Sequence, residues 1–562
     1  MRNGLFAEVK NISENIKKDK FLQKQLEAVR AAGDEMKNIP VASLPLSDFE
    51  IFYKTGSRQE YEDRYFEHRK RLNTYALLAA VYGGEYIVLL QDTIWAVLDE
   101  FTWALPAHIK QNENIFDKIT HIDLFAAETG SALSEILYMT EDIIAPEVSE
   151  RIRYEVRRRI IEPYLSGRKN TWDEIENNWA AVCAGSVGAV FMYLAEEDEI
   201  KAAMPRIMKT ISCYLDGFGD DGACTEGINY WTYGFGYFVY FAELLRRYGG
   251  EDLFDNEKVK NIAMFQHKMR LKGNKTASFS DCGDDFHHRS GLTHFLKKRY
   301  DEVVVPDDGC ALGAYGDDCH RYAHFIRDFA WRDSSLAAGA EEERSCEYFK
   351  DAAWYINKTE KYDLAAKAGT NGESHNHNDI GAFIINAGGR NMITDPGRGE
   401  YTADYFSEAR YKYFAPSALA HSVPIINGTL QKEGADHRGE ITSADEKRLV
   451  MELAGAYECD GLTSLERTFG FSENGISLTD KMSFKDIPES VTEHFVTEAE
   501  PELSDGGIKI GGSMLLYDTG AFDCRISEKT FETGHGKKTV YIIDLELLST
   551  EKHIEMDFDF IV

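Results

Sequence analysis

The sequence is short of the features that mark several specialised classes of protein. Its nine cysteines form no Cys-x-x-Cys pair and are scattered between Cys183 and Cys524, which indicates reduced thiols and excludes a disulfide scaffold. No run reaches the roughly 18 apolar residues of a membrane span, and the first ten residues lack the apolar core of a signal peptide. We therefore expect the chain as given to be cytoplasmic, and periplasmic or secreted if a leader has been removed.

Positive charges are also outnumbered, with 63 Lys and Arg against 95 Asp and Glu. The formal net charge is -32 over 562 residues, which argues against nucleic acid or an anionic membrane as a partner, because their phosphates require a basic surface. At physiological salt the Debye length is about 8 Å, so a locally basic cleft can still function inside an acidic protein. Arg390, Arg398 and Arg410 are candidates for such a cleft.

What the sequence does contain is typical of a large folded protein. Hydrophobic residues make up 43% and aromatic residues 12% of the chain, enough to bury substantial cores. A single core stops growing at about 250–300 residues, so we expect at least two domains.

The two parts of the chain differ in hydrophobic pattern. In the first part, apolar residues recur at three-to-four spacing with few prolines, which predicts helices over 75–82, 152–165, 180–194, 204–215 and 235–248. Helical hairpins in series suggest an α/α toroid over residues 1–340. After about Glu341 short β-rich runs bounded by turns predict antiparallel strands, for example over 382–386, 449–453, 476–484, 492–496 and 539–545. The predicted architecture is thus multidomain α + β, with a β-sandwich domain over 341–562 and a boundary in the polar stretch Gly339–Cys346.

The stretch Ser374-His375-Asn376-His377-Asn378-Asp379 carries the densest chemistry in the chain. If it runs into a strand over 380–386, alternation places His375 and His377 on one face. Asp395 and His421 border two further apolar runs, so neighbouring strands could each contribute one ligand. Imidazole nitrogen and carboxylate oxygen suit a Zn²⁺-type ion. The alternative is that these are hydrogen-bonded polar residues at strand ends.

Two motifs of the helical part carry further candidates. Asn178 and Trp179 lie at the start of the helix predicted over 180–194, where the amide could bind a sugar carboxylate and the ring could pack against a sugar; a plain helix cap is the alternative for Asn178. Tyr230 and Tyr233 lie on one side of the chain if their segment is helical. A tyrosine transfers a proton only where its neighbours favour phenolate.

These motifs, in this order, resemble the heparinase II/III-like polysaccharide lyases. The resemblance covers about Asn170 to Gln431 and rests on three segments, "ENNWAAVCAGSVGA", "CTEGINYWTYGFGYF" and "ESHNHNDIGAFIINAGGRNMITDPGRGEYTADYFSEARYKYFAPSALAHSVPIINGTLQ". It implies β-elimination on a glycan that contains uronic acid, of the glycosaminoglycan type (heparan sulfate, hyaluronan or chondroitin) and with exolytic action open. An anionic polysaccharide or oligosaccharide is then the expected partner. Whether the protein forms a homodimer is left open. Alginate or oligoalginate is the alternative substrate.

The resemblance also implies roles for individual residues. Asn178 matches the asparagine that neutralises the carboxylate, Tyr230 the catalytic tyrosine with Tyr233 as the fallback, and His375 the alternative base. His377, Asp395 and His421 match the ligands of a structural zinc ion. Trp179, Tyr233, Arg410 and Tyr405 are expected to contact the substrate, and Tyr401 or Tyr411 could also enter the cleft. This sequence lacks the histidine that some members carry in the first helical motif, which leaves the identity of the base open between His375 and Tyr230.

Two other classes of function stay in view. A glycoside hydrolase on a similar toroid requires two carboxylic acids about 5–10 Å apart, which Glu226, Asp281, Asp284 and Asp285 could supply. A non-catalytic carbohydrate-binding protein is the other alternative. Only a lyase would produce an unsaturated uronide.

Overall fold

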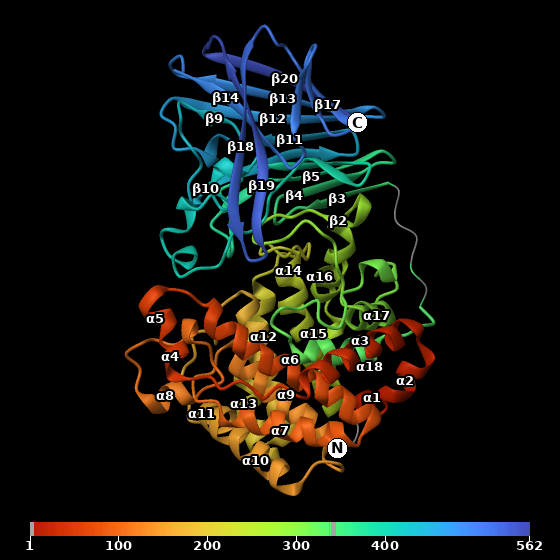
Figure 1. Cartoon of the computed structure of the whole chain (residues 1–562). Coiled ribbons are helices and arrows are strands. Elements are labelled where there is room, and N and C mark those ends of the chain that lie inside the picture. The colour runs from red at the N-terminus through yellow and green to blue at the C-terminus, as the bar shows by residue number, and fades with distance from the viewer. Residues whose placement is uncertain (1–4, 337, 339–343) are drawn as a thin grey trace. The chain divides into compact units, whose positions relative to one another are not determined.

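The structure is a computed structural model that describes residues 5–336, 338 and 344–562 (Figure 1). By their contacts the residues divide into two compact units. The first unit comprises Met1–Gly217, Trp231–Ala263 and His287–Gly339, and the second comprises Phe218–Tyr230, Met264–Phe286 and Ala340–Val562. Two short segments of the expected helical domain, 218–230 and 264–286, thus cluster with the β-rich unit. Most of the predicted boundary, residues 339–343, lies outside the described residues.

The first unit is helical and consists largely of antiparallel helical hairpins. Its α-helices are α1 (Ala7–Lys10), α2 (Ile12–Lys18), α3 (Lys20–Met36), α4 (Leu46–Phe49), α5 (Ile51–Thr55), α6 (Gln59–Tyr82), α7 (Glu85–Asp99), α8 (Ile115–Ile119), α9 (Leu124–Thr140), α10 (Pro146–Val156), α11 (Glu162–Leu165), α12 (Asn178–Leu194), α13 (Glu197–Asp216), α15 (Gly236–Tyr248), α17 (Ser290–Arg299) and α18 (Tyr322–Trp331). Short 3₁₀ or π turns are η2 (Pro106–His108), η3 (Arg157–Ile161), η4 (Trp231–Phe235), η5 (Leu253–Asp255) and η7 (Asp308–Cys310). The helix predicted over 152–165 is real but is interrupted by the π turn η3.

Helix α12 is the buried centre of this unit. It is apolar on all sides, which is typical of a helix surrounded by other helices, and it packs against α9, α13 and α15. Gly188 permits the close approach of α15, because a Cβ atom at this position would lie 2.4 Å from a ring carbon of Phe241. The helix begins at Asn178.

The second unit is dominated by antiparallel sheets. A nine-stranded sheet has the order β15-β16-β17-β20-β13-β12-β11-β10-β6, a four-stranded sheet the order β18-β19-β14-β9 and a five-stranded sheet the order β3-β4-β5-β7-β8. The strands are β3 (Ser345–Phe349), β4 (Trp354–Lys358), β5 (Tyr362–Lys367), β6 (Gly369–Asn371), β7 (Phe383–Ala387), β8 (Arg390–Ile393), β9 (Ile425–Ile426), β10 (Gly434–Asp445), β11 (Arg448–Glu452), β12 (Leu462–Ser472), β13 (Gly475–Phe484), β14 (Val491–Thr497), β15 (Pro501–Ser504), β16 (Gly507–Ile510), β17 (Ser513–Tyr517), β18 (Phe522–Thr533), β19 (Gly536–Leu547) and β20 (His553–Ile561). The short elements of this unit are α14 (Ile228–Tyr230), β1 (Arg270–Leu271), η6 (Lys272–Asn274), β2 (Lys275–Thr276), η8 (Asp404–Phe406), η9 (Arg410–Lys412), η10 (Ala418–Ala420) and η11 (Ala454–Ala456). Helix α16 (Glu257–Lys268) belongs to the first unit up to Ala263 and to the second unit from Met264.

The core of the second unit lies where the sheets face one another. Phe383 of β7 contacts Phe469 of β12 at a ring-centroid distance of 5.0 Å, Phe560 of β20 at 5.8 Å and Phe495 of β14 at 6.2 Å. One aromatic side chain thus links the three large sheets, which pack as a sandwich (Figure 1). The predicted strands and the predicted fold class, a helical toroid followed by antiparallel sheets, are confirmed.

Candidate functional site: a buried carboxylate between two histidines

The Ser374–Asp379 motif forms a loop between β6 and β7, not the strand that we expected. Strand β7 begins only at Phe383, and His375 adopts a left-handed conformation with φ 57°. Such a value is uncommon for a residue other than glycine. The shared face of His375 and His377 therefore cannot come from strand alternation, and a different feature must bring the two rings together.

Amide side chains hold this loop in place of a β ladder. Asn376 donates from Nδ2 to the backbone oxygen of Asn371 at 3.0 Å, and Asn378 donates to the backbone oxygen of Gln431 at 3.2 Å. Gln431 in turn accepts from the backbone N–H of Ile380 at 2.9 Å and donates to the oxygen of the same residue at 2.7 Å. Buried backbone groups need such partners, so the asparagines of the motif serve the loop while its histidines point elsewhere.

Asp281 is the group around which the two histidines gather. Its side chain is 1% exposed and accepts five hydrogen bonds. The donors are His375 Nδ1 (2.9 Å) and the Tyr401 hydroxyl (3.0 Å) on Oδ2, and His377 Nε2 (3.0 Å), the Tyr405 hydroxyl (3.1 Å) and Arg410 Nη2 (2.9 Å) on Oδ1. Burial alone would raise the pKa of Asp281, but these hydrogen bonds and the positive charge of Arg410 hold it well below the usual range of a carboxyl group. Asp281 is therefore a carboxylate.

A tight loop presents Asp281 to the site. Ser278 donates from its hydroxyl to the backbone oxygen of Asp395 at 3.0 Å, and Ser280 donates to that of Thr225 at 2.8 Å. Gly397 makes the approach possible, since a Cβ atom there would lie 2.0 Å from the backbone oxygen of Cys282, and its φ is +72°. The Asp281 loop is thus fixed between two other segments of the second unit.

Tyr230 and His375 lie face to face beside this carboxylate. Their ring centroids are 4.0 Å apart with the planes inclined by 20°, and the Tyr230 and Tyr401 hydroxyls are 2.9 Å apart. Because Tyr401 donates its one proton to Asp281, its oxygen accepts from Tyr230. Both Tyr230 and His375 are partly exposed, unlike Asp281. Together with Tyr401, which is also partly exposed, they are members of the group that a ligand in solvent can reach.

The same geometry assigns the proton on His375. A carboxylate only accepts hydrogen bonds, so Nδ1 of His375 carries hydrogen and the lone pair of the neutral ring is on Nε2. The Nε2 atom lies 3.8 Å from a carboxylate oxygen of Glu226, beyond hydrogen-bond distance. Burial raises the pKa of Tyr230 and the charge of Asp281 adds to this effect, while Tyr401 and Arg398 oppose it. His375 is arranged to accept a proton, and Tyr230 to hold one.

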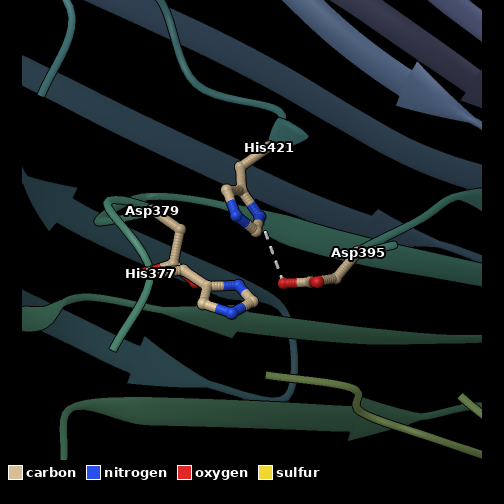
Figure 2. A group of neighbouring side chains, drawn as sticks. All are labelled: His377, Asp379, Asp395 and His421. Atoms are coloured by element: carbon tan, nitrogen blue, oxygen red, sulfur yellow. Dashed lines mark ion pairs between the residues drawn. The ribbon is translucent and has the colours of Figure 1, made fainter. Parts of the chain in front are cut away.

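A second group of side chains can hold a metal ion (Figure 2). One potential ligand atom from each of His377, Asp379, Asp395 and His421 lies within 4.8 Å of every other, and all four residues are buried. His421 Nδ1 is 3.2 Å from an oxygen of Asp395, the contact drawn as a dashed line in Figure 2. Asp395 follows β8, whereas His421 follows η10 and His377 lies in the loop, so the ligands do not come from three successive strands as expected.

The donor atoms of this cluster are oriented for a cation. His377 directs Nε2 to Asp281, and His421 directs Nε2 to the backbone oxygen of Ala415 at 3.0 Å. Within the described part of the chain, the remaining atoms, His377 Nδ1, His421 Nδ1, Asp379 Oδ2 and Asp395 Oδ2, have no hydrogen-bond partner, apart from the 3.2 Å ion-pair contact between His421 Nδ1 and Asp395 Oδ2. Outward hydrogen bonds of this kind fix the tautomer of a metal-binding histidine. The residues therefore fit a divalent metal of the zinc type.

Charges act differently on the two histidines of the cluster. Burial would lower the pKa of His421, but Asp395 outweighs this effect and the pKa is raised, so a metal must displace a proton from His421 when it binds. Burial lowers the pKa of His377, which favours the neutral imidazole that a metal requires. Burial would raise the pKa of Asp395, but His421 outweighs it and the pKa is lowered. Asp379 also accepts from Lys367 Nζ at 2.7 Å through its other oxygen. Both carboxylates are thus available as anionic ligands.

The remaining predicted residues of the helical part lie in the first unit. Asn177, not Asn178, caps α12, since its Oδ1 accepts from the backbone N–H of Trp179 at 3.1 Å; the helix-cap alternative for Asn178 is therefore removed. Asn178 is buried, and Trp179 is partly exposed with its ring 4.8 Å from that of His108. The π turn η4 begins directly after Tyr230, and Tyr233 donates its hydroxyl hydrogen to Glu128 at 2.7 Å. Their roles toward a substrate stay predictions.

The candidate arginines have different environments. Arg410 is buried and binds Asp281 and the backbone oxygen of Asn376, and Tyr405 is likewise buried against Asp281. Arg398 is partly exposed, with its guanidinium 4.8 Å from the Tyr401 ring centre. Arg390 is exposed on β8. Substrate contact by Arg410 and Tyr405 stays a prediction, and Arg398 is the cation beside the exposed rings.

The sequence alone does not identify two central residues of the site, Asp281 and Asp379, in the roles that the structure gives them. Asp281 lies 94 positions before His375, and no local pattern distinguishes it from its neighbours Asp284 and Asp285. Asp379 follows His377 at a spacing of two, which was a usable signal for a fourth ligand. Sequence patterns locate ligands that are adjacent in the chain more readily than partners that only folding brings together.

The chain is similar to known proteins in sequence and in fold. Residues 342–495 match the family described as "Heparinase II/III-like, C-terminal", so the resemblance noted from the motifs is confirmed over that segment. No curated protein sequence matches the chain. No helix in the described residues has the length and apolar character needed to cross a membrane.

Several solved structures share the fold over nearly the whole chain. Heparinase III aligns with a TM-score of 0.62 at 14% identity, covering 98% of this chain and 91% of that one. Heparan sulfate lyase HepC from Pedobacter heparinus gives 0.58 at 14%, covering 93% and 78%. Chondroitin AC lyase from Streptomyces coelicolor A3, in complex with chondroitin sulphate, gives 0.59 at 10%, covering 99% and 82%. These similarities agree with the expected enzyme class, the polysaccharide lyases.

Proposed function

We propose that this protein is a polysaccharide lyase that cleaves a uronic-acid-containing glycan by β-elimination. The observation that carries the proposal is the pair of partly exposed, stacked rings of Tyr230 and His375, each joined by hydrogen bonds to the buried Asp281, directly in the case of His375 and through Tyr401 in the case of Tyr230. The pair offers one proton acceptor and one proton donor side by side. β-Elimination requires both.

The reaction divides between the two rings. His375 Nε2 takes the proton from C5 of the uronic acid, and the electrons left on C5 form the C4–C5 double bond as the bond from C4 to the glycosidic oxygen breaks. The Tyr230 hydroxyl gives its proton to the departing oxygen. The raised pKa of Tyr230 suits this acid role, whereas phenolate formation would be required if Tyr230 served as the base.

Negative charge that develops on the uronate carboxylate must be stabilised. The side-chain amide of Asn178 is the proposed donor for this charge, as the motif resemblance implies, and donors aimed at developing charge are a large source of catalysis. Arg398 is a further candidate because it lies beside Tyr401 and lowers the pKa of Tyr230.

Zinc is the proposed occupant of the His377, Asp379, Asp395 and His421 cluster. Two neutral imidazoles and two carboxylates form a four-ligand set with no solvent-exposed member, which is typical of a structural site. When bound, the ion supplies binding energy that holds together the loops that carry its ligands, and the residues that transfer protons are other side chains.

The alternative hypothesis, a glycoside hydrolase, requires two available carboxylic acids. Asp281 is buried and accepts five hydrogen bonds, so it cannot serve as a proton donor, and Asp284 and Asp285 share Lys275 Nζ at 2.8 Å each. Glu226 lies 3.8 Å from His375 Nε2, the proposed base. These contacts favour the lyase.

The substrate class is proposed as a glycosaminoglycan, with alginate as the alternative. The solved structures with this fold include a heparan sulfate lyase and a chondroitin AC lyase, and all these glycans present a C5 proton beside a carboxylate. The decisive experiment incubates the protein with heparan sulfate, hyaluronan, chondroitin sulfate and alginate, each as polymer and as short oligosaccharides. A lyase produces ultraviolet-absorbing unsaturated uronides, and a shortening oligomer ladder without large fragments would identify exolytic action. New reducing ends without ultraviolet absorbance would instead establish a hydrolase, and binding without any product a carbohydrate-binding protein.

Single substitutions test the assignment of the two rings. Tyr230→Phe and His375→Asn should each lower turnover by at least about 10²-fold, because each removes one proton-transfer group. Asparagine is chosen at position 375 because it tolerates the left-handed backbone found there. Tyr233→Phe tests the fallback tyrosine and should lower turnover far less than Tyr230→Phe, because the Tyr233 hydroxyl donates to Glu128. Loss of activity in Tyr233→Phe with near-normal activity in Tyr230→Phe would transfer the catalytic role to Tyr233.

A further inference from the structure

Asp281 joins the proposed catalytic pair to the metal cluster through a single carboxylate. Oδ2 receives hydrogen bonds from His375 and Tyr401, and Oδ1 receives one from the metal-binding candidate His377. All of these residues belong to the second unit. Each of the two sites therefore has one histidine whose orientation depends on the same buried group.

The chemistry of a carboxylate makes this dependence specific. Since an ionised carboxyl group accepts and never donates, the nitrogen of each histidine that faces Asp281 must carry hydrogen. His375 is thereby left with its lone pair on Nε2, and His377 with its lone pair on Nδ1, the atom that faces Asp379, Asp395 and His421. Arg410 supplies a balancing positive charge on Oδ1.

We propose that Asp281 is a positioning residue that sets the tautomers of His375 and His377 together, and so links the metal affinity of one site to turnover at the other. The part that concerns turnover rests on the proposed lyase function. The part that concerns metal affinity does not depend on any activity. An outer carboxylate that orients a metal-binding histidine commonly accounts for 10–100-fold in metal affinity.

The test replaces the carboxylate with an amide of the same shape. Asp281→Asn cannot accept from five donors, and its NH₂ group opposes at least one of them. We expect zinc affinity, measured by competition with a chelator of known affinity, to fall by about 10–100-fold. At saturating zinc we expect kcat to stay at least about 10²-fold below that of the wild type, with a smaller change in KM, because the positioning of the base is lost whereas the substrate contacts remain.

Two further variants make the result interpretable. Asp363→Asn is the matched control, since Asp363 is also fully buried in the second unit but is bonded to the backbone N–H and the Nζ of Lys272; zinc affinity and kcat should not change. Asp281→Glu keeps the charge but displaces the two oxygens, so we expect intermediate values of both quantities. Thermal midpoints establish that each variant is folded.

The outcomes separate this proposal from the proposed function. Unchanged zinc affinity in Asp281→Asn would overturn the metal half, and unchanged kcat would overturn the catalytic half. Failure of both Asp281→Asn and Asp281→Glu to fold, while Asp363→Asn folds, would assign Asp281 to fold stability alone and overturn both halves. A wild-type protein without lyase activity but with a lowered zinc affinity in Asp281→Asn would refute the lyase and retain the link between Asp281 and the metal.

Discussion

At the scale of single residues, Asn178 shows how the structure separates two interpretations of one motif. Asn177 provides the cap of α12, so the buried amide of Asn178 is not needed for that purpose. Asn178→Ala should therefore abolish most turnover, by about 10²-fold or more if the amide stabilises developing charge. The thermal midpoint should change little. Asn177→Ala is the control and should show the reverse, a loss of about 1 kcal/mol of stability with turnover per folded molecule retained. A stability loss confined to Asn178→Ala would refute the catalytic interpretation.

Glu128 is a residue whose environment predicts a measurable pH effect. It accepts from Tyr233 at 2.7 Å and lies 3.5 Å from Arg321, with a side chain that is 10% exposed. Burial raises the pKa of Glu128 to about 7 from an ordinary value of 4.5, although Arg321 and Tyr233 oppose the rise. Between these two pH values the folded protein retains a proton that the unfolded chain has released.

The sign of the effect follows from this difference in bound protons. The contribution of Glu128 to stability should fall as pH rises from about 4.5 to about 7 and stay constant above that, a change on the order of 3 kcal/mol. Glu128→Gln removes the titrating group. The thermal midpoint of this variant should therefore rise relative to that of the wild type as pH increases from about 4.5 to about 7. Asp142→Asn, an exposed position just after α9, is the control. A pH-independent difference between Glu128→Gln and the wild type would contradict the prediction.

The candidate site illustrates what residue patterns can and cannot predict. His377, Asp395 and His421 were identified because histidines and acids at the ends of apolar runs are uncommon, and the structure brings them together. From the sequence alone, Asp281 is only one of four acids that could serve a hydrolase. Its role depends on five donors from positions 375 to 410, which no local pattern encodes.

At the scale of elements, the hairpin of β18 and β19 supports the loop that carries Tyr401, Tyr405 and Arg410. Lys538 donates from Nζ to the backbone oxygen of Pro396 at 3.1 Å, and the backbone N–H of Glu400 donates to the oxygen of Glu532 at 3.1 Å. Phe531 packs on Phe414 with ring centroids 5.3 Å apart. The end of the hairpin thus contacts both sides of the loop.

Weakening this support should reduce catalysis from a distance. Lys538→Ala should lower turnover by about 10-fold, because small displacements of catalytic groups have large kinetic effects. Lys537→Ala is a close control, since the neighbouring side chain is 72% exposed and, among the described residues, its ion pair is with Glu532 of the same hairpin. Equal turnover in the two variants would show that the loop does not depend on Lys538.

The elements themselves were largely predictable, and the exceptions have physical causes. Strands such as β13 and β19 follow from alternation because one face of each is buried. The expected strand across His377 fails because buried asparagine side chains, not a neighbouring strand, satisfy that backbone. The π turn η4 after Tyr230 is a local widening of a helix that periodicity does not reveal, and such turns are frequent at functional sites.

At the scale of the whole molecule, the two architectures were predictable but their exact membership was not. The hydrophobic pattern of the sequence distinguishes the helical part from the β-rich part. Segments 218–230 and 264–286 nevertheless cluster with the sheets. These segments carry Tyr230 and Asp281. Local periodicity indicates secondary structure, whereas membership of a compact unit depends on long-range contacts. The hydrogen bonds between Asp281 and partners 94 or more positions later in the chain are an example.

The distribution of ligands between the units leads to a prediction about metal removal. His377, Asp379, Asp395 and His421 all belong to the second unit, so a chelator should destabilise that unit alone. Free zinc at about 100 times its Kd stabilises a folded state by about 2.7 kcal/mol, and the thermal midpoint should fall by a corresponding amount when zinc is stripped. His421→Ala should have the lower midpoint from the start and respond little to the chelator.

Hydrogen–deuterium exchange locates the effect within the chain. Peptides from the ligand-bearing loops, residues 372–382 and 394–424, should exchange faster after zinc removal because the ion no longer holds them together. Peptides from α12 in the first unit should exchange at an unchanged rate. Faster exchange in α12 to the same extent would mean that the ion stabilises the entire chain, and no change in either set would exclude a structural metal. Immediate loss of turnover with both sets unchanged would place the ion in contact with the substrate, in which case its role would be catalytic.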